Sequence, residues 1–533
     1  MLKVLLFFVL LIAGAGIAYT QEYIDIGINY DKVDLVSSYR ASVTHTQNTC
    51  ESWKNSTAVN SARFLLESST EFQNQHIMGW GALNPWPDST ITNPATWEWA
   101  SLDSRVKLIR DTKGIPIITL CGCPTWMHTP TRNGATDWGT SLEKAPSVDH
   151  FDDFAHLCAE VARRYPDVVH FQVWNELKGF WSMPWNRWRF EDYTSMYNMV
   201  YDSLKKVNQN IKIGGPYPVV ATYSTQKSFT STLGGVYGLY DKRPMDVIAY
   251  WLDHKHGADF ICVDGRLLNK DGILNCDIFR TPSKHTDIIN WIRQQLDADD
   301  PTEIWWSEWY ANPGPNDPQD NATFNNALMA SALITTIMTG SSNVLLWQPE
   351  GDESGFSFPL GIWTSTSTSS GGRATPFYYT AKILKENFSK GIEIVHCEWS
   401  SEDINVLASA ENTLLVNHRN KNIDVRINQS VTLSLAPYEV RLIDAVPLVD
   451  PDGSAINISY NNSSGMLELR NLKPESETVN YSIFNQIGTL IRSGKINATS
   501  EYGINLQMLP SGVYIYRIAY MSKLYSRVFI RFR

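Results

Sequence analysis

The chain has 533 residues, a hydrophobic content of 43% and a formal net charge of −10. This length suggests two or three domains, and the balance of apolar and charged residues excludes a disordered chain. The acidic charge, without any run of Lys and Arg, argues against a nucleic-acid partner.

The N-terminal segment predicts a secretory signal peptide. Lys3 precedes an apolar run that extends to about Ala18, and small residues lead to a cleavage site after Thr20. We therefore expect residues 1–20 to be a signal peptide, with a retained membrane anchor as the alternative. Further along the chain, no segment has the length and apolarity of a membrane span.

Short β-type runs alternate with helical patterns between about residues 40 and 392. The predicted strands are 40–46, 75–82, 115–122, 168–175, 211–217, 259–265, 303–309 and 343–349. Eight such strands predict a (β/α)₈ barrel with insertions, and we assign the catalytic domain to residues 21–392. A doubly wound open sheet is the alternative, but its usual glycine-rich ligand turn is missing.

Two β-rich regions follow the predicted barrel. Residues 393–445 alternate apolar and polar positions with turns between them, which predicts a flanking β-sandwich module. A segment rich in Pro, Asp and Gly begins near Val446, and we expect residues 446–533 to form a separate C-terminal β-sandwich domain.

The seven cysteines indicate neither a metal site nor a disulfide framework. Their odd number leaves at least one thiol unpaired, although Cys262 and Cys276 could close a loop. Cys121 and Cys123 lack metal-ligand spacing and are predicted to pack in a strand. The HExxH, GxSxG and GxGxxG motifs are absent, so we expect no metal and no cofactor.

Two glutamates stand where predicted strands end. The fourth strand ends in Trp174-Asn175-Glu176, and the seventh ends in Ser307-Glu308-Trp309. Side chains at the carboxyl ends of barrel strands line the active site, so these carboxylates are expected to converge. Such a pair suits acid/base and nucleophilic chemistry at a glycosidic bond. The alternative is that both glutamates form salt bridges at the surface.

Other strand ends supply candidate substrate-binding residues. They are Asn175, His45, Trp80, Asn84, Trp126, Tyr217, Asp264, Trp347 and Gln348. His45 has an alternative role as a core histidine, and each tryptophan could be packing rather than a sugar platform. Lys178, Arg187 and Arg189 could bind a uronate carboxylate, or they could form a solvated rim. An acidic group that begins at Glu350 is expected to be solvated.

The motifs around the two glutamates resemble clan A glycoside hydrolases, and family 39 in particular. The segments that carry the resemblance are VWNELKGFW, IKIGGPY, IWWSEWY, LLWQPEG and MGWGALNPWPD. The resemblance implies a retaining mechanism, with Glu176 as acid/base and Glu308 as nucleophile. It also implies a raised pKa for Glu176 and an ionised Glu308. One departure is the sixth strand, which ends in Asp264 and Arg266 where related enzymes place tyrosine or histidine.

The tail resembles the C-terminal sorting domain of the type IX secretion system. The resemblance rests on VNYSIFNQIG and LPSGVYIYRI, and a fibronectin-like or adhesion sandwich is the alternative. Nine glycosylation sequons leave modification open; they lie at Asn55, Asn321, Asn387, Asn428, Asn457, Asn461, Asn462, Asn480 and Asn497. Either interpretation places the protein outside the cell or on its surface.

The sequence as a whole predicts a secreted retaining glycoside hydrolase acting on an oligo- or polysaccharide. A barrel that binds carbohydrate without cleaving it is one alternative. A glycosyl-transferring enzyme that uses the same residues with a sugar acceptor is another. The sugar itself is left open among xylosides, iduronides, glucuronides and galactosides.

Overall fold

The structure, a computed structural model, describes most of the chain beyond residue 22. The described residues are 23–46, 49–77, 81–82, 85, 95, 97–128, 144–311, 322–351, 361–446, 457–461, 465–470, 478–485, 489–497, 501–510, 512–520 and 523–531. The predicted signal peptide lies outside them. The chain divides into two compact units, one containing the barrel and the other containing the C-terminal sheets.

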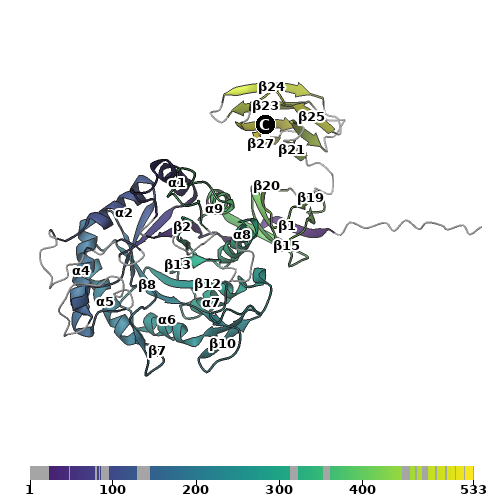
Figure 1. Cartoon of the computed structure of the whole chain (residues 1–533). Coiled ribbons are helices and arrows are strands. Elements are labelled where there is room, and N and C mark those ends of the chain that lie inside the picture. The colour runs from purple at the N-terminus through teal and green to yellow at the C-terminus, as the bar shows by residue number, and fades with distance from the viewer. Residues whose placement is uncertain are drawn as a thin grey trace, which may run out of the picture. The chain divides into compact units, whose positions relative to one another are not determined.

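Eight parallel strands close into a barrel, as the sequence predicted (Figure 1). In barrel order they are β2 (Arg40–His45), β3 (Phe72–His76), β4 (Ile115–Leu120), β5 (His170–Val173), β8 (Lys212–Val219), β12 (Phe260–Arg266), β13 (Glu303–Tyr310) and β14 (Asn343–Trp347). The second strand begins earlier than predicted. Its residues FQNQH are all buried, and most of them are polar, so the apolar pattern did not reveal it.

Helices surround the barrel in Figure 1. They are α1 (Ser56–Ser69), α2 (Ala100–Asp111), α4 (Phe151–Arg164), α5 (Phe190–Val207), α6 (Lys242–His254), α7 (Ser283–Arg293), α8 (Ala322–Met338) and α9 (Pro376–Asn387). Shorter elements in the connections are η2 (Thr125–Met127), η3 (Val148–His150), β6 (Trp181–Ser182), β7 (Arg187–Trp188), β9 (Thr222–Tyr223), β10 (Thr230–Gly235), β11 (Gly238–Asp241) and η4 (Ile278–Arg280). Each helix buries one apolar face, except α8, which is buried on nearly all sides.

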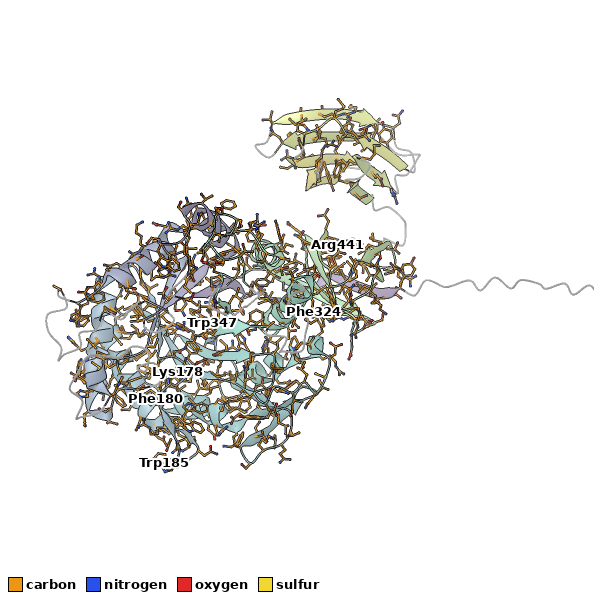
Figure 2. The ribbon with its side chains drawn as sticks, in the orientation of Figure 1. Lys178, Phe180, Trp185, Phe324, Trp347 and Arg441 are labelled. Carbon is orange, nitrogen blue, oxygen red and sulfur yellow. The ribbon has the colours of Figure 1, made fainter. Side chains whose placement is uncertain are left out.

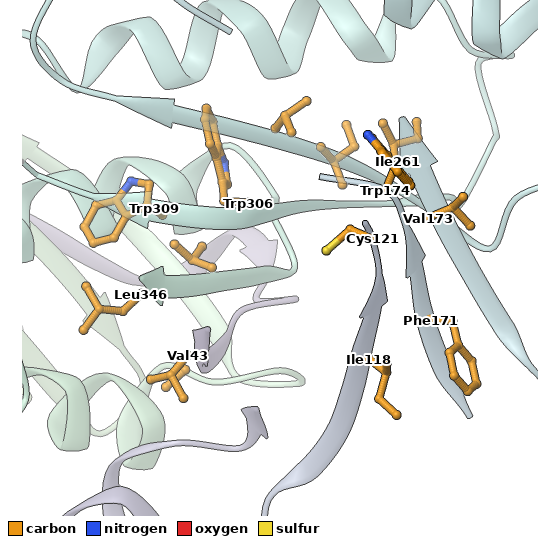
Figure 3. Packing of buried hydrophobic residues seen from close by; sticks show 14 of the residues in the cluster. Val43, Ile118, Cys121, Phe171, Val173, Trp174, Ile261, Trp306, Trp309 and Leu346 are labelled. Atoms are coloured by element: carbon orange, nitrogen blue, oxygen red, sulfur yellow. The ribbon is translucent and has the colours of Figure 1, made fainter. Parts of the chain in front are cut away.

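Side chains alternate between the two faces of the barrel wall. Figure 3 shows part of the outer set, including Val43, Ile118 and Phe171, which belongs to the main apolar core. The inner set begins with an apolar layer: Phe72, Ile117, Tyr217, Phe260, Cys262, Trp305 and Leu345. This packed interior makes the barrel a rigid support for the residues at its carboxyl end.

A polar layer lies two residues further along the inner face. Its members are Thr44, Asn74, Thr119, Gln172 and Ser307. Asn74 Nδ2 donates to Thr44 Oγ1 at 3.1 Å, and Thr119 Oγ1 donates to Asn74 Oδ1 at 2.8 Å. Gln172 Nε2 donates to Thr119 Oγ1 at 3.3 Å, and Ser307 Oγ donates to Gln172. These buried bonds join the first, second, third, fourth and seventh barrel strands directly below the strand ends.

The flanking module is a seven-stranded sheet, and its composition corrects one predicted boundary. The sheet order is β19 (Val431–Leu435), β18 (Ile423–Ile427), β1 (Ile24–Val36), β15 (Glu393–Trp399), β16 (Ile404–Ser409), β17 (Asn412–Asn417) and β20 (Val440–Asp444). Sequence analysis assigned the residues of β1 to the barrel. They instead join this sheet, because Ile26 and Ile28 alternate with exposed residues in the period of a half-buried strand.

The C-terminal region contains two antiparallel sheets around its own core. One sheet is β21 (Asn457–Asn461), β22 (Met466–Arg470) and β25 (Glu501–Asn505). The other is β24 (Leu490–Ile496), β23 (Val479–Asn485), β26 (Gly512–Tyr520) and β27 (Lys523–Arg531). Leu467 and Leu469 of the first sheet share an apolar cluster with Ile483 and Ile518 of the second, as expected for a sandwich.

The seven cysteines are free thiols in the structure. The possible Cys262–Cys276 bridge is therefore wrong. Cys262 is buried in the apolar layer inside the barrel, where it packs rather than pairs. Among the helices of the described ranges, none is long and apolar enough to cross a membrane.

Candidate active site

The chain turns sharply where the fourth barrel strand ends, and this turn presents Asn175 and Glu176. Trp174, Glu176 and Leu177 have φ values of 70°, 49° and 51°, a left-handed region that costs free energy for residues with a Cβ. The buried indole of Trp174 stabilises the turn by donating from Nε1 to Lys178 O at 2.8 Å. Gly179 follows at φ 81°, and a Cβ there would lie 2.0 Å from the backbone nitrogen of Ala145.

Glu308 and Asp264 lie opposite each other on neighbouring strands. The register of β12 and β13 shifts after Val263, and this irregularity pairs Asp264 with Glu308. Bulges of this kind often re-aim a side chain beside an active site. One carboxylate oxygen each from Glu176, Asp264 and Glu308 lies within 4.8 Å of the others. Three carboxyl groups therefore meet at the carboxyl end of the barrel.

Lys178 is the cation that holds this cluster. Its Nζ lies 2.7 Å from Glu176 Oε2 and donates to Asn175 Oδ1 at 2.8 Å. Figure 2 labels Lys178 within the barrel unit, while Trp185 of the same connection lies at the lower edge of that unit. The ammonium group therefore fixes the positions of both candidate residues at the end of the fourth strand.

Glu308 is surrounded by groups that can donate hydrogen bonds. Asn175 Nδ2 donates to Glu308 Oε1 at 3.2 Å, and His76 Nε2 lies 3.4 Å from the same oxygen. Tyr217 is fully buried, is hydrogen-bonded to Glu308, and has its hydroxyl 3.5 Å from His76 Nε2. Burial lowers the pKa of His76 to about 3, with Lys178 adding to the shift, so its imidazole is neutral.

The pKa shifts of the two glutamates are the reverse of those expected from sequence. Burial raises the pKa of Glu308 to about 8, and the charge of Glu176 adds to this. Burial also acts to raise the pKa of Glu176, but Lys178 and a hydrogen bond with Asp264 outweigh it and lower that pKa. Burial, followed by the charges of Glu176 and Glu308, raises the pKa of Asp264 well above its usual value.

Arg266 follows Asp264 on the sixth strand but acts on a different group. The positive charge that acts on Asp264 is that of Lys178. Arg266 instead acts on Lys284, a buried lysine whose Nζ donates to Arg266 O at 3.1 Å. The three carboxylates have a spacing that a cation could use, but Lys178 already pairs with Glu176 within the group. We assign no metal to it.

Among the remaining predicted residues, His45 is a correction. It is 1% exposed, and its Nε2 lies 2.9 Å from Gln73 Oε1. Thr44, its neighbour, points into the barrel, so His45 points outward toward helix α2, where Thr112 also contacts Gln73. We remove His45 from the substrate-binding candidates because its alternative role in the core fits these contacts.

The predicted tryptophans have different outcomes. Trp80 and Asn84 lie outside the described residues. Trp126 is partly buried in η2, with its ring 5.2 Å from that of His150. Trp347, labelled in Figure 2, is half-buried at the end of β14. Gln348 follows it with φ 58° and donates its backbone N–H to Thr44 O at 3.1 Å. All three described residues stay predicted contacts.

Charged residues near the site have partners within the protein. Arg187 pairs with Glu191 at 2.8 Å, and Arg189 pairs with Asp192 at 2.6 Å. Both pairs are local to the start of α5, which weakens the uronate alternative. Glu350, expected to be solvated, is 4% exposed and lies 2.7 Å from Lys54 Nζ. That pair is structural.

Sequence reasoning missed two parts of the site. His76 was not considered because its strand was predicted to begin at residue 75, where the alternation of faces is not evident. Lys178 was considered only as a binder of a uronate carboxylate or as part of a solvated rim. Its spacing of two and three residues from Glu176 and Asn175 was a usable signal, since a turn at the end of a strand brings such neighbours together.

The closed barrel and the two glutamates at its fourth and seventh strands define a domain of the glycoside hydrolase class. The model of glycosyl hydrolases family 39 matches residues 88–345, which include Glu176, Asp264 and Glu308. Over these residues the chain is similar to the enzymes of family 39.

One relative and two solved structures are similar to this chain. A β-xylosidase from Caldicellulosiruptor saccharolyticus is 22% identical over 204 residues, or 38% of this chain, and the chain spans only 36% of that protein. The crystal structure of a glucosidase from Croceicoccus marinus has a TM-score of 0.51 at 13% identity, over 96% of this chain and 100% of that one. A family 39 enzyme from Xanthomonas axonopodis pv. citri has a TM-score of 0.51 at 13% identity, over 92% and 96%. Both structures share the fold.

The tail was also identified correctly. The model of the secretion system C-terminal sorting domain matches residues 450–531. Such domains mark proteins that the type IX system secretes and attaches to the cell surface or releases. The chain is therefore directed outside the cell.

Proposed function

We propose that the chain is a retaining glycoside hydrolase that cleaves an O-glycosidic bond by double displacement. The observation that carries this proposal is the approach of Glu176 and Glu308 oxygens to within 4.8 Å. Retaining enzymes hold their carboxyl groups about 5–5.5 Å apart, whereas inverting enzymes need about 6.5–9.5 Å to admit water. The approach of the two oxygens to within 4.8 Å supports the shorter, retaining separation.

Each glutamate has a defined part in this mechanism. The Glu308 carboxylate attacks the anomeric carbon while a proton from Glu176 goes to the glycosidic oxygen, and the C–O bond to the leaving group breaks. Water then transfers a proton to Glu176 and attacks the anomeric carbon, which releases Glu308 as a carboxylate. Asn175 and Tyr217 hold Glu308 in position by hydrogen bonds.

The stereochemistry of the first product tests this proposal. We expect NMR spectroscopy of a fresh reaction to show the anomer of the substrate before mutarotation occurs. An aryl-glycoside panel supplies the substrate, starting with β-xylosides because the similar curated protein is a β-xylosidase. An inverted first product would contradict double displacement. Product on a sugar acceptor rather than water would favour the glycosyl-transferring alternative.

The acid limb of the pH–rate profile should lie near pH 8. Glu308 must be ionised to attack, and its pKa is raised to about 8 in the free enzyme. Because ionisation increases with pH, kcat/KM should rise about tenfold per pH unit below that value and level off above it. The measurement uses a strongly activated aryl glycoside, for which protonation of the leaving group matters least. A limb two or more units lower would contradict the raised pKa.

A further inference from the structure

Asp264 is a third carboxyl group that the two-glutamate mechanism does not use. It is 5% exposed, lies opposite Glu308 in the strand register, and is hydrogen-bonded to Glu176. Two carboxyl groups in such a hydrogen bond must share a proton, because two carboxylates have only acceptors. The question is which of them holds it.

The surroundings place this proton on Asp264. Lys178 Nζ lies 2.7 Å from Glu176 Oε2, which favours the anionic form of Glu176. Asp264 faces Glu176 and Glu308, two groups that disfavour its own ionisation. Among the described residues, His76 beside the cluster is neutral, and burial raises the pKa of Tyr217 well above its usual value and that of Cys121 to about 12, so both stay protonated.

We propose that Asp264 is a positioning residue that stores the proton for the acid step and delivers it through Glu176 to the leaving group. This inference rests on the proposed function. Glu176 begins as a carboxylate and takes the proton of Asp264 as it protonates the glycosidic oxygen. Glu176 and Asp264 are then both carboxylates, and Glu308 has lost its charge by forming its bond to the sugar. In the second step Glu176 takes a proton from water and returns one to Asp264, and Glu308 is released. Charge is conserved in each step.

The arrangement explains how an acid/base residue can be paired with a lysine. A glutamate held as an anion by an ammonium group has no proton of its own to give. A protonated carboxyl group behind it supplies one without breaking the Lys178 pair. Lys178 also balances part of the negative charge that accumulates after the transfer.

Asp264→Asn tests the proposal, since the amide keeps a hydrogen-bond donor but has no transferable proton. We expect kcat/KM to fall about 10²-fold for aryl glycosides with poor leaving groups. Strongly activated ones should be nearly unaffected, and their acid limb should stay near pH 8 because a neutral group replaces a neutral group. Asp259→Asn is the control, since it lies just before the same strand and removes a carboxylate paired with Lys205 and Lys212. It should change neither the leaving-group dependence nor the pH dependence of kcat/KM.

Equal losses for all leaving groups would show a merely structural role for Asp264 and overturn the proposal. The double variant Asp264→Asn, Lys178→Gln adds a second check. Without the ammonium group Glu176 can keep its own proton. The double variant should therefore regain part of the kcat/KM that Asp264→Asn loses on substrates with poor leaving groups. No restoration would also contradict the proposal.

A spectroscopic measurement keeps the proposal testable if Asp264→Asn is inactive. In Glu308→Gln at neutral pH, infrared spectroscopy should detect one buried protonated carboxyl group that is missing after Asp264→Asn is added. If the infrared band of the protonated carboxyl group is unchanged after Asp264→Asn is added, Asp264 does not hold the proton and the proposal is wrong. These outcomes are separate from the proposed function, because retention of configuration in the native enzyme does not depend on where the acid proton is stored.

Discussion

Glu308→Gln is expected to lower kcat/KM by about 10⁴-fold or more on every substrate. An amide cannot form the covalent bond to the sugar, and loss of a nucleophile removes most of the rate enhancement. The measurement compares steady-state rates with those of Glu303→Gln, a change at the opposite end of the same strand, where Glu303 pairs with Arg40. We expect Glu303→Gln to retain activity. Substantial turnover by Glu308→Gln would exclude Glu308 as nucleophile.

The same variant should be more stable than the native chain in alkaline solution. The pKa of Glu308 is raised to about 8 by burial and by Glu176, so the folded state binds its proton more tightly than the unfolded state does. Stability is therefore lost as pH rises from the ordinary carboxyl range through about 8, and glutamine avoids this loss. A difference in Tm that grows over this pH window would show that inactivity does not arise from misfolding.

Glu176→Ala is expected to discriminate strongly between leaving groups. Poor leaving groups need protonation in the transition state, so their kcat/KM should fall by about 10²–10⁴-fold. Strongly activated aryl glycosides should lose far less. Rates measured across a series of substituted phenyl glycosides give this dependence directly.

Two further variants control for indirect effects of Glu176→Ala. The alanine leaves Lys178 without its carboxylate partner, so Glu176→Gln, which keeps a hydrogen-bond acceptor beside the ammonium group, should show the same dependence. Glu191→Ala removes a carboxylate from the surface pair with Arg187 and should leave all rates unchanged. Uniform losses in both Glu176 variants would exclude this residue from the acid role.

The barrel and the convergence of Glu176 and Glu308 could be predicted because their signals are local. Most of the parallel strands are buried on both faces and have a short apolar run as their sequence, and Glu176 and Glu308 follow two of these runs at the end that lines the site. Strand β3 was predicted a few residues too late in the sequence for the opposite reason. Asn74 faces the polar layer inside the barrel, and Gln73 and Gln75 bond to groups outside it, so burial here does not require apolar residues.

The protonation states could not be predicted because they depend on contacts between distant parts of the chain. Sequence showed that Asp264 was unusual, but not that a shift in register brings it beside Glu308. It showed Lys178, but not that the left-handed turn at Glu176 directs the ammonium group back onto the carboxylate. A pKa results from the sum of such contacts, and a difference of a few ångströms can change its direction.

The pairing of β1 within the flanking sheet has a consequence for how the chain folds. Its partner β15 begins at Glu393, so this strand must wait until the barrel sequence has been synthesised before its hydrogen bonds can form. His396 and Asp34, 2.9 Å apart, are an example of a contact made at this late stage. Contacts over such sequence separations close slowly, and an unpaired strand is prone to pair wrongly in the meantime. The last steps of folding in this unit should therefore join its two ends.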